Sequence, residues 1–226
     1  MESPTERLVA DAAALGVPLS ERDAVRLLAL LDELAKWNRT YNLTAVTTRA
    51  QMVTHHLLDS LAIHPDVRGE RIADVGTGAG FPGLPLALVN PARQFTLIDS
   101  GGKKVRFVAH AVRTLGIANV EVAQARAESL TPAHPFDTVT ARAFAPLAQL
   151  LAHAGRLCAR DGQVLAMKGK WPAEELAALP PPWRLAGGRE LAVPGLAEAR
   201  CVLVLRQDAG GQDALRRDAA AARSSP

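Results

Sequence analysis

The spacing of apolar positions divides the chain near Gly69. From residue 5 to residue 65, apolar side chains recur every three or four positions, which places them on one face of a helix. The clearest run follows Ser20, a residue type favoured at helix N-caps, and consists of Val25, Leu27, Leu28, Leu31, Leu34 and Ala35. A second helix is predicted over residues 50–63, closed by Pro65.

Residues 37–44 interrupt this periodicity with a polar and aromatic segment, Trp-Asn-Arg-Thr-Tyr-Asn-Leu-Thr. The segment is predicted to be a loop between the two helices. Loops held by rigid elements often supply contacts to ligands, so Asn38 and Asn42 are candidates for binding a substrate base. Shaping the loop itself is an equally good interpretation of both side chains.

After Gly69 the pattern changes to short β-rich runs that alternate with helical stretches. Strands are predicted at residues 71–75, 95–99, 120–123, 136–141, 163–167 and 201–205. Helices fit between them at residues 85–89, 103–115, 147–157 and 173–179. Such alternation predicts an α/β fold with a parallel sheet that helices cover on both faces.

These patterns predict three parts of the chain. Residues 1–68 form a helical extension packed on the core, and residues 69–208 form the α/β domain. Residues 209–226 are rich in Ala, Arg, Gly and Ser and contain no aromatic residue. That composition is typical of a disordered tail.

Composition sets only broad limits on function. The 226 residues carry 26 Lys and Arg against 23 Asp and Glu, a net charge of +3, which permits an RNA partner without requiring one. No apolar run approaches the roughly 20 residues that span a bilayer, and the first residues lack the features of a secretory signal. Cys158 and Cys201 have no metal-ligand spacing. We expect a cytoplasmic monomer with reduced thiols and no bound metal.

The strongest chemical feature is the glycine-rich turn after the first predicted strand, Asp-Val-Gly-Thr-Gly-Ala-Gly-Phe-Pro-Gly at residues 74–83. Glycine lets the backbone turn sharply and lets a ligand approach closely. A turn between a strand and a helix lies at the carboxyl edge of the sheet, where open α/β folds bind ligands. Asp99 ends the next predicted strand, 23 residues after Gly76. An acid there can accept hydrogen bonds from the ribose hydroxyls of a nucleoside cofactor.

Two kinds of nucleoside cofactor fit this arrangement. An Asp-x-Gly-x-Gly-x-Gly turn is typical of S-adenosylmethionine-dependent methyltransferases, but Gly78, Gly80 and Gly83 also satisfy the formal dinucleotide fingerprint. Pro82 and Pro85 have no amide N–H, whereas a pyrophosphate needs such donors at the start of the helix. The turn therefore favours a sulfonium cofactor, which carries no phosphate.

Further motifs agree in order and spacing with one family. They are Trp37-Asn38, Asn42-Leu43-Thr44, His56-Leu57-Leu58-Asp59-Ser60, the glycine turn, Leu97-Ile98-Asp99-Ser100, Arg126-Ala127-Glu128, Arg142-Ala143-Phe144-Ala145 and Lys168-Gly169. With these motifs the chain resembles the ribosomal small-subunit methyltransferase G family over roughly residues 25–205. The resemblance implies a class I S-adenosylmethionine-dependent methyltransferase fold, with a Rossmann-like seven-stranded sheet, helices on both faces and an N-terminal helical extension. It also implies methyl transfer to N7 of one guanine in the 16S rRNA of the bacterial small ribosomal subunit.

The turn and the resemblance together imply a cofactor site and a substrate site. The expected contacts of S-adenosylmethionine are Gly76, Gly78, Phe81, Asp99, Ser100, Gly101, Ala127, Glu128 and Arg142. The candidates for positioning the substrate are Arg142 and Lys168, and those for binding RNA are Asn38, Asn42, His56, Lys103 and Lys168. The chain departs from the family's usual pattern at His55, where many relatives carry Lys or Arg, and at Ala141, where Ser is commoner.

Each candidate side chain also has a purely structural interpretation. Arg142 can form an ion pair instead of contacting guanine O6 or the cofactor carboxylate. Lys168 can be a solvated lysine at a strand end instead of a phosphate contact. His56 and Phe81 can be packed core residues, and Lys103 belongs to a basic run of a kind that is usually a solvated helix face.

Guanine N7 presents a lone pair and carries no proton, so its methylation needs no general base. The enzyme has to align the nucleophile, methyl carbon and sulfur, and we expect no catalytic base or covalent nucleophile. A guanine in folded RNA must be unstacked or presented in a loop, and the modest charge favours an assembled ribonucleoprotein over naked RNA as substrate.

Two alternative functions remain, a nicotinamide-dependent oxidoreductase and a non-catalytic RNA-binding protein. The first lacks an evident hydride-relay pair of residues. The second has no need of the glycine turn and Asp99.

Overall fold

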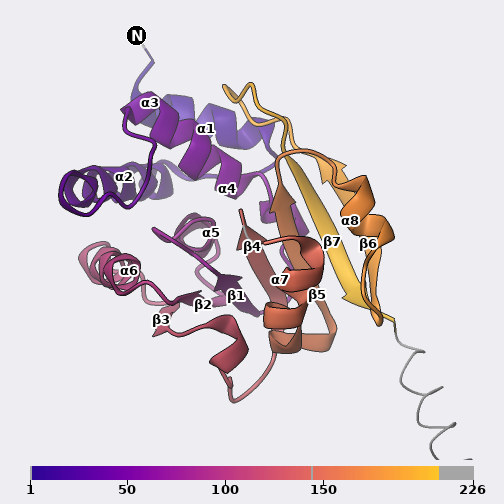
Figure 1. Ribbon diagram of the computed structural model, residues 1–226. Coiled ribbons are helices and arrows are strands. Elements are labelled where there is room, and N and C mark those ends of the chain that lie inside the picture. The colour runs from indigo at the N-terminus through magenta and orange to yellow at the C-terminus, as the bar shows by residue number, and fades with distance from the viewer. Residues whose placement is uncertain (1, 144, 209–226) are drawn as a thin grey trace, which may run out of the picture.

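A seven-stranded sheet with the order β3-β2-β1-β4-β5-β7-β6 forms the centre of the protein, and helices lie on both faces (Figure 1). This computed structural model describes residues 2–143 and 145–208. The strands are β1 (Arg71–Val75), β2 (Gln94–Asp99), β3 (Val120–Gln124), β4 (Phe136–Arg142), β5 (Cys158–Lys168), β6 (Trp183–Glu190) and β7 (Cys201–Gln207). The predicted fold class, a Rossmann-like α/β sheet with an N-terminal helical extension, is confirmed. The tail predicted at residues 209–226 lies outside the described residues.

The helices fall into an N-terminal group and a group between the strands. The first group is α1 (Pro4–Ala14), α2 (Glu21–Tyr41), α3 (Arg49–Met52), the π-helical η1 (Val53–Leu58), α4 (Asp59–Leu61) and the 3-10 turn η2 (His64–Asp66). The second is α5 (Gly83–Val89), α6 (Gly102–Thr114), η3 (Ala127–Ser129), α7 (Leu147–Ala154), η4 (Gly155–Leu157) and α8 (Ala173–Ala177). Ser20 caps α2 as predicted, since its hydroxyl accepts the Asp23 N–H at 3.1 Å.

Side chains that alternate along the strands supply two separate hydrophobic clusters, one on each face of the sheet. One face carries Ile72, Phe95, Leu97, Leu165, Met167 and Val202, which pack with residues of α1, α2, α4, α5 and α6. The other carries Ala73, Val75, Ile98, Val139, Val164 and Leu203, which pack mainly with α7. The N-terminal helices therefore share one core with a face of the sheet. This shared core holds the extension against the strand ends where the candidate site lies.

The prediction of a loop at residues 37–44 is wrong for residues 37–41, which are helical. Helix α2 continues to Tyr41, and Asn42 ends it in the left-handed conformation, with φ of 49°. Trp37 extends the apolar stripe of the helix, because its ring packs edge-on against Phe107 of α6 at 5.7 Å between centroids. The polar composition of this segment predicts a loop, but the aromatic contact of Trp37 with α6 favours the helix, and this contact is evident only in the tertiary structure.

The second predicted helix is also more irregular than its pattern indicated. Residues 49–61 are helical, but η1 inserts a π-helical segment in the middle of the stretch. Pro65 lies within η2 and not at the end of the helix itself. Segments of π-helix are rare and occur often at functional sites, and η1 carries His55 and His56.

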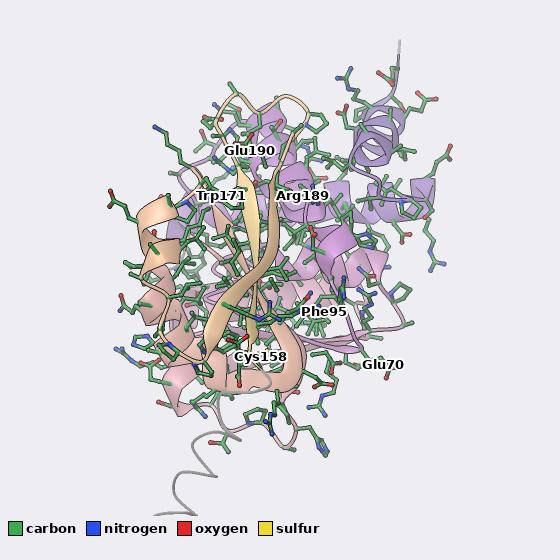
Figure 2. The ribbon with its side chains drawn as sticks, turned by 90° about the vertical axis from the view of Figure 1, so that its right-hand side faces the viewer. Glu70, Phe95, Cys158, Trp171, Arg189 and Glu190 are labelled. Carbon is green, nitrogen blue, oxygen red and sulfur yellow. The ribbon has the colours of Figure 1, made fainter. Side chains whose placement is uncertain are left out.

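The sheet is mixed and not wholly parallel as predicted. Strand β7 runs antiparallel to both β5 and β6. The apolar pattern missed β6, because most of its residues are exposed and Gly187 and Gly188 interrupt it. Figure 2 faces this edge of the sheet and shows Arg189 and Glu190 near Trp171, at the end of β6. An exposed edge strand does not need the apolar alternation from which strands are predicted.

Candidate active site

The glycine turn between β1 and α5 uses its own backbone N–H groups to hold its shape. Gly76 donates to the Ile98 carbonyl at 2.9 Å, and Gly80 donates to Thr77 at 3.0 Å. The N–H of Gly83 donates to the buried Asp74 carboxylate at 2.8 Å. Gly80 has φ of 89°, a conformation open mainly to glycine. A turn with its N–H groups occupied in this way is unsuited to binding a pyrophosphate, which supports the choice against a dinucleotide.

Asp74 fixes the turn from inside the sheet. Its Oδ2 accepts the Thr77 hydroxyl at 2.5 Å, and its Oδ1 accepts the Thr140 hydroxyl of β4 at 3.0 Å. Burial raises the pKa of Asp74, and these hydrogen bonds oppose that rise. Asp74 is therefore a structural anchor of the turn, and its carboxylate is enclosed by donors of the protein itself.

Asp99 ends β2 on the same edge and is also tied to the backbone. Its Oδ2 accepts the Gly78 N–H at 2.9 Å, and its Oδ1 accepts the Gly101 N–H at 2.8 Å. Lys104 of α6 lies 3.9 Å from Oδ2. Each carboxylate oxygen can accept a further hydrogen bond, so the bonds to Gly78 and Gly101 orient the group without exhausting it.

A cavity of about 340 Å³ opens beside Asp99. Its lining residues are Val75, Gly76, Ile98, Asp99, Ser100, Lys104, Ala125, Arg126, Ala127, Glu128 and His153. Apolar side chains from two strand ends and η3 face a carboxylate that can accept hydrogen bonds, a combination that suits the flat base and the ribose of a nucleoside. The lining residues of this cavity therefore fit the nucleoside part of S-adenosylmethionine.

The cavity gathers five of the predicted cofactor contacts: Gly76, Asp99, Ser100, Ala127 and Glu128. Gly78 and Gly101 are not among its lining residues but donate hydrogen bonds to Asp99, and Phe81 and Arg142 also lie outside the lining. The sequence patterns did not single out Lys104, Arg126 as a lining residue, or His153. Arg126 belongs to a family motif and Lys104 follows the candidate Lys103, but His153 on α7 is brought to the cavity only by the fold.

Beyond the turn, Phe81 joins the sheet to the N-terminal extension. Its ring is buried and stacks on the imidazole of His56 with 4.7 Å between centroids. The guanidinium of Arg142, at the end of β4, lies 5.7 Å from the centre of the same ring. Phe81 thus supports two of the predicted substrate-side residues by packing and by a cation–π contact.

His56 is buried among these groups. Its Nε2 lies 3.0 Å from the Thr44 hydroxyl, and its buried Nδ1 has no hydrogen-bond partner among the described residues. Burial, aided by the charge of Arg142, lowers the pKa of His56 to about 4. The imidazole is therefore neutral near pH 7.

Asp59 lies buried between Arg142, the last residue of β4, and Arg200, the residue before β7. Its Oδ2 accepts a hydrogen bond from Arg142 Nη1 at 3.0 Å, and Arg200 Nε lies 3.3 Å from Oδ1. Arg142 Nη1 also donates to the His55 carbonyl at 2.8 Å. The extension thereby fixes the guanidinium of Arg142, while the remaining nitrogens of that group have no partner among the described residues.

The two predicted asparagines occupy different surroundings. Asn38 is buried and shapes the loop, because its amide oxygen accepts the Thr44 N–H at 2.9 Å and its amide nitrogen donates to the Thr44 carbonyl at 3.0 Å. Asn42 is exposed at the end of α2. The structure thus brings Asn38 to His56 through Thr44 and leaves Asn42 at the surface.

The two predicted lysines also differ. Lys168 ends β5 and pairs with Glu175 of α8 at 2.9 Å, and that carboxylate also accepts the Leu147 N–H at 2.6 Å. Lys103 is exposed in the first turn of α6. The ammonium group of Lys168 is therefore fixed by an ion pair at the end of β5, whereas the side chain of Lys103 is exposed to solvent.

Solved structures show where this fold belongs. TrmN from Thermus thermophilus is 24% identical, with a TM-score of 0.53 and coverage of 66% of this chain and 47% of that one. A SAM-dependent methyltransferase from Aquifex aeolicus is 19% identical, with a TM-score of 0.52 and coverage of 69% and 92%. The sheet, the turn and the nucleoside-sized cavity define a Rossmann-like methyltransferase.

The family follows from sequence comparison. Residues 24–204 match the family described as rRNA small subunit methyltransferase G. The protein of that name from Chromohalobacter salexigens is 50% identical over 201 residues, or 89% of this chain and 96% of its own, and the one from Marinobacter nauticus is 47% identical over 193 residues, or 85% and 90%. The chain belongs to the rRNA small subunit methyltransferase G family, and its cofactor is S-adenosylmethionine.

Among the described residues, no helix has the length and apolar character needed to cross a membrane. Cys158 and Cys201 are both buried and free of disulfides.

Proposed function

We propose that this chain methylates N7 of a guanine in small-subunit rRNA, with S-adenosylmethionine as methyl donor and without a general base. The names of its relatives support rRNA as the substrate, and the family resemblance supports guanine N7. The observation that carries the proposal is the state of the titratable groups around the site. In the described part of the chain, Asp74 and Asp99 hold the turn, and none of His56, Asp59 and Glu175 is arranged to take a proton from a substrate.

These three groups are already engaged. His56 has a pKa of about 4 and shares its Nε2 with Thr44, so it is a weak base at neutral pH. Asp59 is held between two arginines, and Glu175 is held by Lys168. An amine or hydroxyl nucleophile would have to lose a proton in the reaction, whereas N7 of guanine has none to lose.

The bound cofactor supplies an electrophilic methyl group on a sulfonium. Asp99 orients the ribose, and the apolar walls of the cavity enclose the adenine. Arg142 has N–H donors beyond those given to Asp59 and His55, and they suit guanine O6, the acceptor next to N7. The side chain thereby sets the direction of the N7 lone pair, and such positioning contributes several kcal/mol to lowering a barrier.

We propose further that Lys168, at the carboxyl end of β5, helps to position the RNA. His56 supports Arg142, because both contact the ring of Phe81. The extension, residues 1–68, supplies His56 and Asp59, while residues 69–208 supply the cofactor cavity. The protein acts as a monomer without a metal, on an assembled particle that presents the guanine unstacked. Because ribosomes are assembled in the cytoplasm, the proposal places the protein there.

Nucleoside analysis tests the proposal directly. Purified protein is incubated with labelled S-adenosylmethionine and small ribosomal subunits from cells that lack this enzyme. The expected product is 7-methylguanosine at one rRNA site, formed faster on subunits than on protein-free rRNA. Label in a different methylated nucleoside would contradict the N7 assignment, and equal rates on both substrates would contradict the particle as substrate.

A further inference from the structure

Tyr41, the last residue of α2, is an exposed aromatic residue beside the candidate active site. It is 38% exposed, although its ring lies 5.3 Å from Trp37 between centroids. Trp37 itself packs against Phe107 of α6. One side of the Tyr41 ring therefore packs on Trp37, which connects it to the core through Phe107, and part of the ring is exposed to solvent.

The packing of α2 against α6 places Tyr41 next to the first turn of α6. The contacts along this packing include Arg26 Nη2 with the carbonyl of Leu115, the C-cap of α6, at 3.1 Å, Glu33 with His110 at 2.8 Å, and Trp37 with Phe107 at 5.7 Å between ring centroids. Residue numbers rise along α2 as they fall along α6, so the helices are antiparallel. One further turn along α2 brings Tyr41 to the level of Lys103.

The face of α6 beside Tyr41 is basic. Lys103, Arg106 and His110 follow one another at positions i, i+3 and i+7, which places them on one side of the helix. Residues 102–114 contain no Asp or Glu. Lys103 and Arg106 are exposed and form no ion pair with any residue in the described ranges. An exposed aromatic ring beside exposed cations is the combination that binds single-stranded nucleic acid, by stacking on a base and by contacts to phosphates.

This surface adjoins the cofactor cavity. Lys104, the residue after Lys103, lines the cavity and lies 3.9 Å from Asp99. On the other side, Tyr41 precedes the loop in which Thr44 contacts His56. An RNA strand that delivers a base to the strand edge from this side passes Tyr41 before it reaches the cofactor.

We propose that Tyr41, Lys103 and Arg106 form a docking surface for an unpaired stretch of the RNA substrate next to the target nucleotide. The Tyr41 ring stacks on one base, and Lys103 and Arg106 bind the phosphates that flank it. The proposal rests on the proposed function, since it takes RNA to be the substrate. It commits to single-stranded RNA because the surface combines a stacking ring with uncompensated positive charge.

The test compares Tyr41→Leu with Tyr41→Phe, which keeps the ring. With small subunits as substrate, Tyr41→Leu raises KM about tenfold or more, since stacking on an aromatic ring contributes strongly to single-strand binding. Its kcat and its dissociation constant for S-adenosylhomocysteine stay within about twofold of wild type, and Tyr41→Phe keeps KM within the same limit. Lys103→Gln raises KM and lowers the slope of log KM against log salt by about 0.7, the value for one phosphate contact to a single strand.

Arg113→Gln is the matched control, because Arg113 is exposed on the same helix at its far end. It leaves KM and the salt slope unchanged. A wild-type KM in Tyr41→Leu overturns the proposal, and so does a Tyr41→Phe variant that is as defective as Tyr41→Leu. If Tyr41→Leu fails to fold, the salt slope of Lys103→Gln decides, and an unchanged slope overturns the proposal.

A direct binding measurement separates this inference from the proposed function. The anisotropy of a short fluorescent single-stranded RNA gives the dissociation constant for each variant without any methyl transfer. Weaker binding by Tyr41→Leu and Lys103→Gln, with wild-type binding by Arg113→Gln, supports the docking surface even where rRNA methylation is not detected. Equal binding by all variants overturns the surface even where the enzyme methylates rRNA.

Discussion

In the cofactor half of the active site, formed by the turn, Asp99 and the cavity, backbone N–H groups and the carboxylates of Asp74 and Asp99 define the geometry. In the substrate half, formed by His56, Asp59, Phe81, Arg142 and Arg200, side chains hold one another through stacking and ion pairs. The first half comes mainly from one short stretch of sequence, residues 74–104, and residues 125–128 with His153 of α7 complete the cavity. The second joins segments more than 80 residues apart, as the contact between Asp59 and Arg142 shows.

This difference predicts different responses to mutation. A site built from backbone bonds keeps its shape when a neighbouring side chain changes, and it loses ligand affinity mainly when its acceptor is lost. A site built from paired charges loses stability when one partner is removed, because the other charge stays in place without compensation. The substitutions below test whether the two halves behave in these separate ways.

The largest effect on stability is expected from Asp59→Asn. The amide keeps the size of the side chain but leaves Arg142 and Arg200 without their shared anion. Because both arginines are partly exposed, we expect the free energy of unfolding to fall by about 3 kcal/mol, at the lower end for a broken buried pair. Chemical denaturation measures this change, and calorimetry with S-adenosylhomocysteine is expected to give cofactor affinity within about threefold of wild type.

Asp66→Asn is the matched control for that substitution. Asp66 pairs with Arg189 at 2.8 Å, but the arginine side chain is 43% exposed. We expect a loss of no more than about 1 kcal/mol, as for other exposed pairs. Equal losses in the two variants would contradict the view that burial of Asp59 makes the difference. A large loss of cofactor affinity in Asp59→Asn would show that the two halves are coupled.

The next largest effect is expected from Asp99→Asn, on cofactor affinity. The substitution removes the charge that strengthens the bonds to Gly78 and Gly101 and, under the proposed function, the bond to the cofactor ribose. Loss of charge-assisted bonds of about 1.5–3 kcal/mol each corresponds to an affinity lowered by about a hundredfold. The dissociation constant of S-adenosylhomocysteine measures it. A change below threefold would mean that Asp99 serves the turn alone.

Much of the cofactor half is predictable from sequence, and the reason is physical. The turn and Asp99 are marked by glycines and by a strand end, and each acts within its own segment. His153 is not predictable in this way, because it lies on α7, far along the chain from the turn, and only the tertiary fold brings it to the cavity. Strand β6 was missed because its exposed residues show no apolar alternation.

The substrate half is predictable in its residues but not in its arrangement. The family motifs point to His56, Arg142 and Lys168, but no spacing indicates that Asp59 joins Arg142 to Arg200 or that Glu175 holds Lys168. Asn38 is a candidate for substrate binding by residue type, yet its amide is bonded to Thr44 on both sides. Pairings of this kind depend on which strand ends the fold places side by side.

A smaller effect is expected from pH on the substrate half. His56 has a folded-state pKa of about 4, below the value of about 6.5 in an unfolded chain. The unfolded state therefore binds an extra proton between these values. Stability is complete above about pH 6.5 and falls by about 2 to 3 kcal/mol as the pH drops toward 4. Urea unfolding midpoints measured across this range should fall less steeply in His56→Gln than in wild type. Parallel profiles would contradict a buried neutral His56.

The smallest effect is expected from His153→Ala in the wall of the cofactor cavity. His153 lines the cavity, and its Nδ1 lies 3.9 Å from the Glu128 carboxylate, a distance typical of a weak and partly exposed pair. Loss of the imidazole removes a packing surface from the cavity wall, so the dissociation constant of S-adenosylhomocysteine should rise about three- to fivefold, or about 1 kcal/mol. His134→Ala, at an exposed position outside the cavity lining, should leave it unchanged. If His153→Ala also binds like wild type, the nucleoside is held by the segment from Val75 to Glu128 alone, and the contrast between a local cofactor half and a dispersed substrate half becomes sharper. If its affinity falls as far as that of Asp99→Asn, the cofactor half depends on distant segments as well, and the contrast fails.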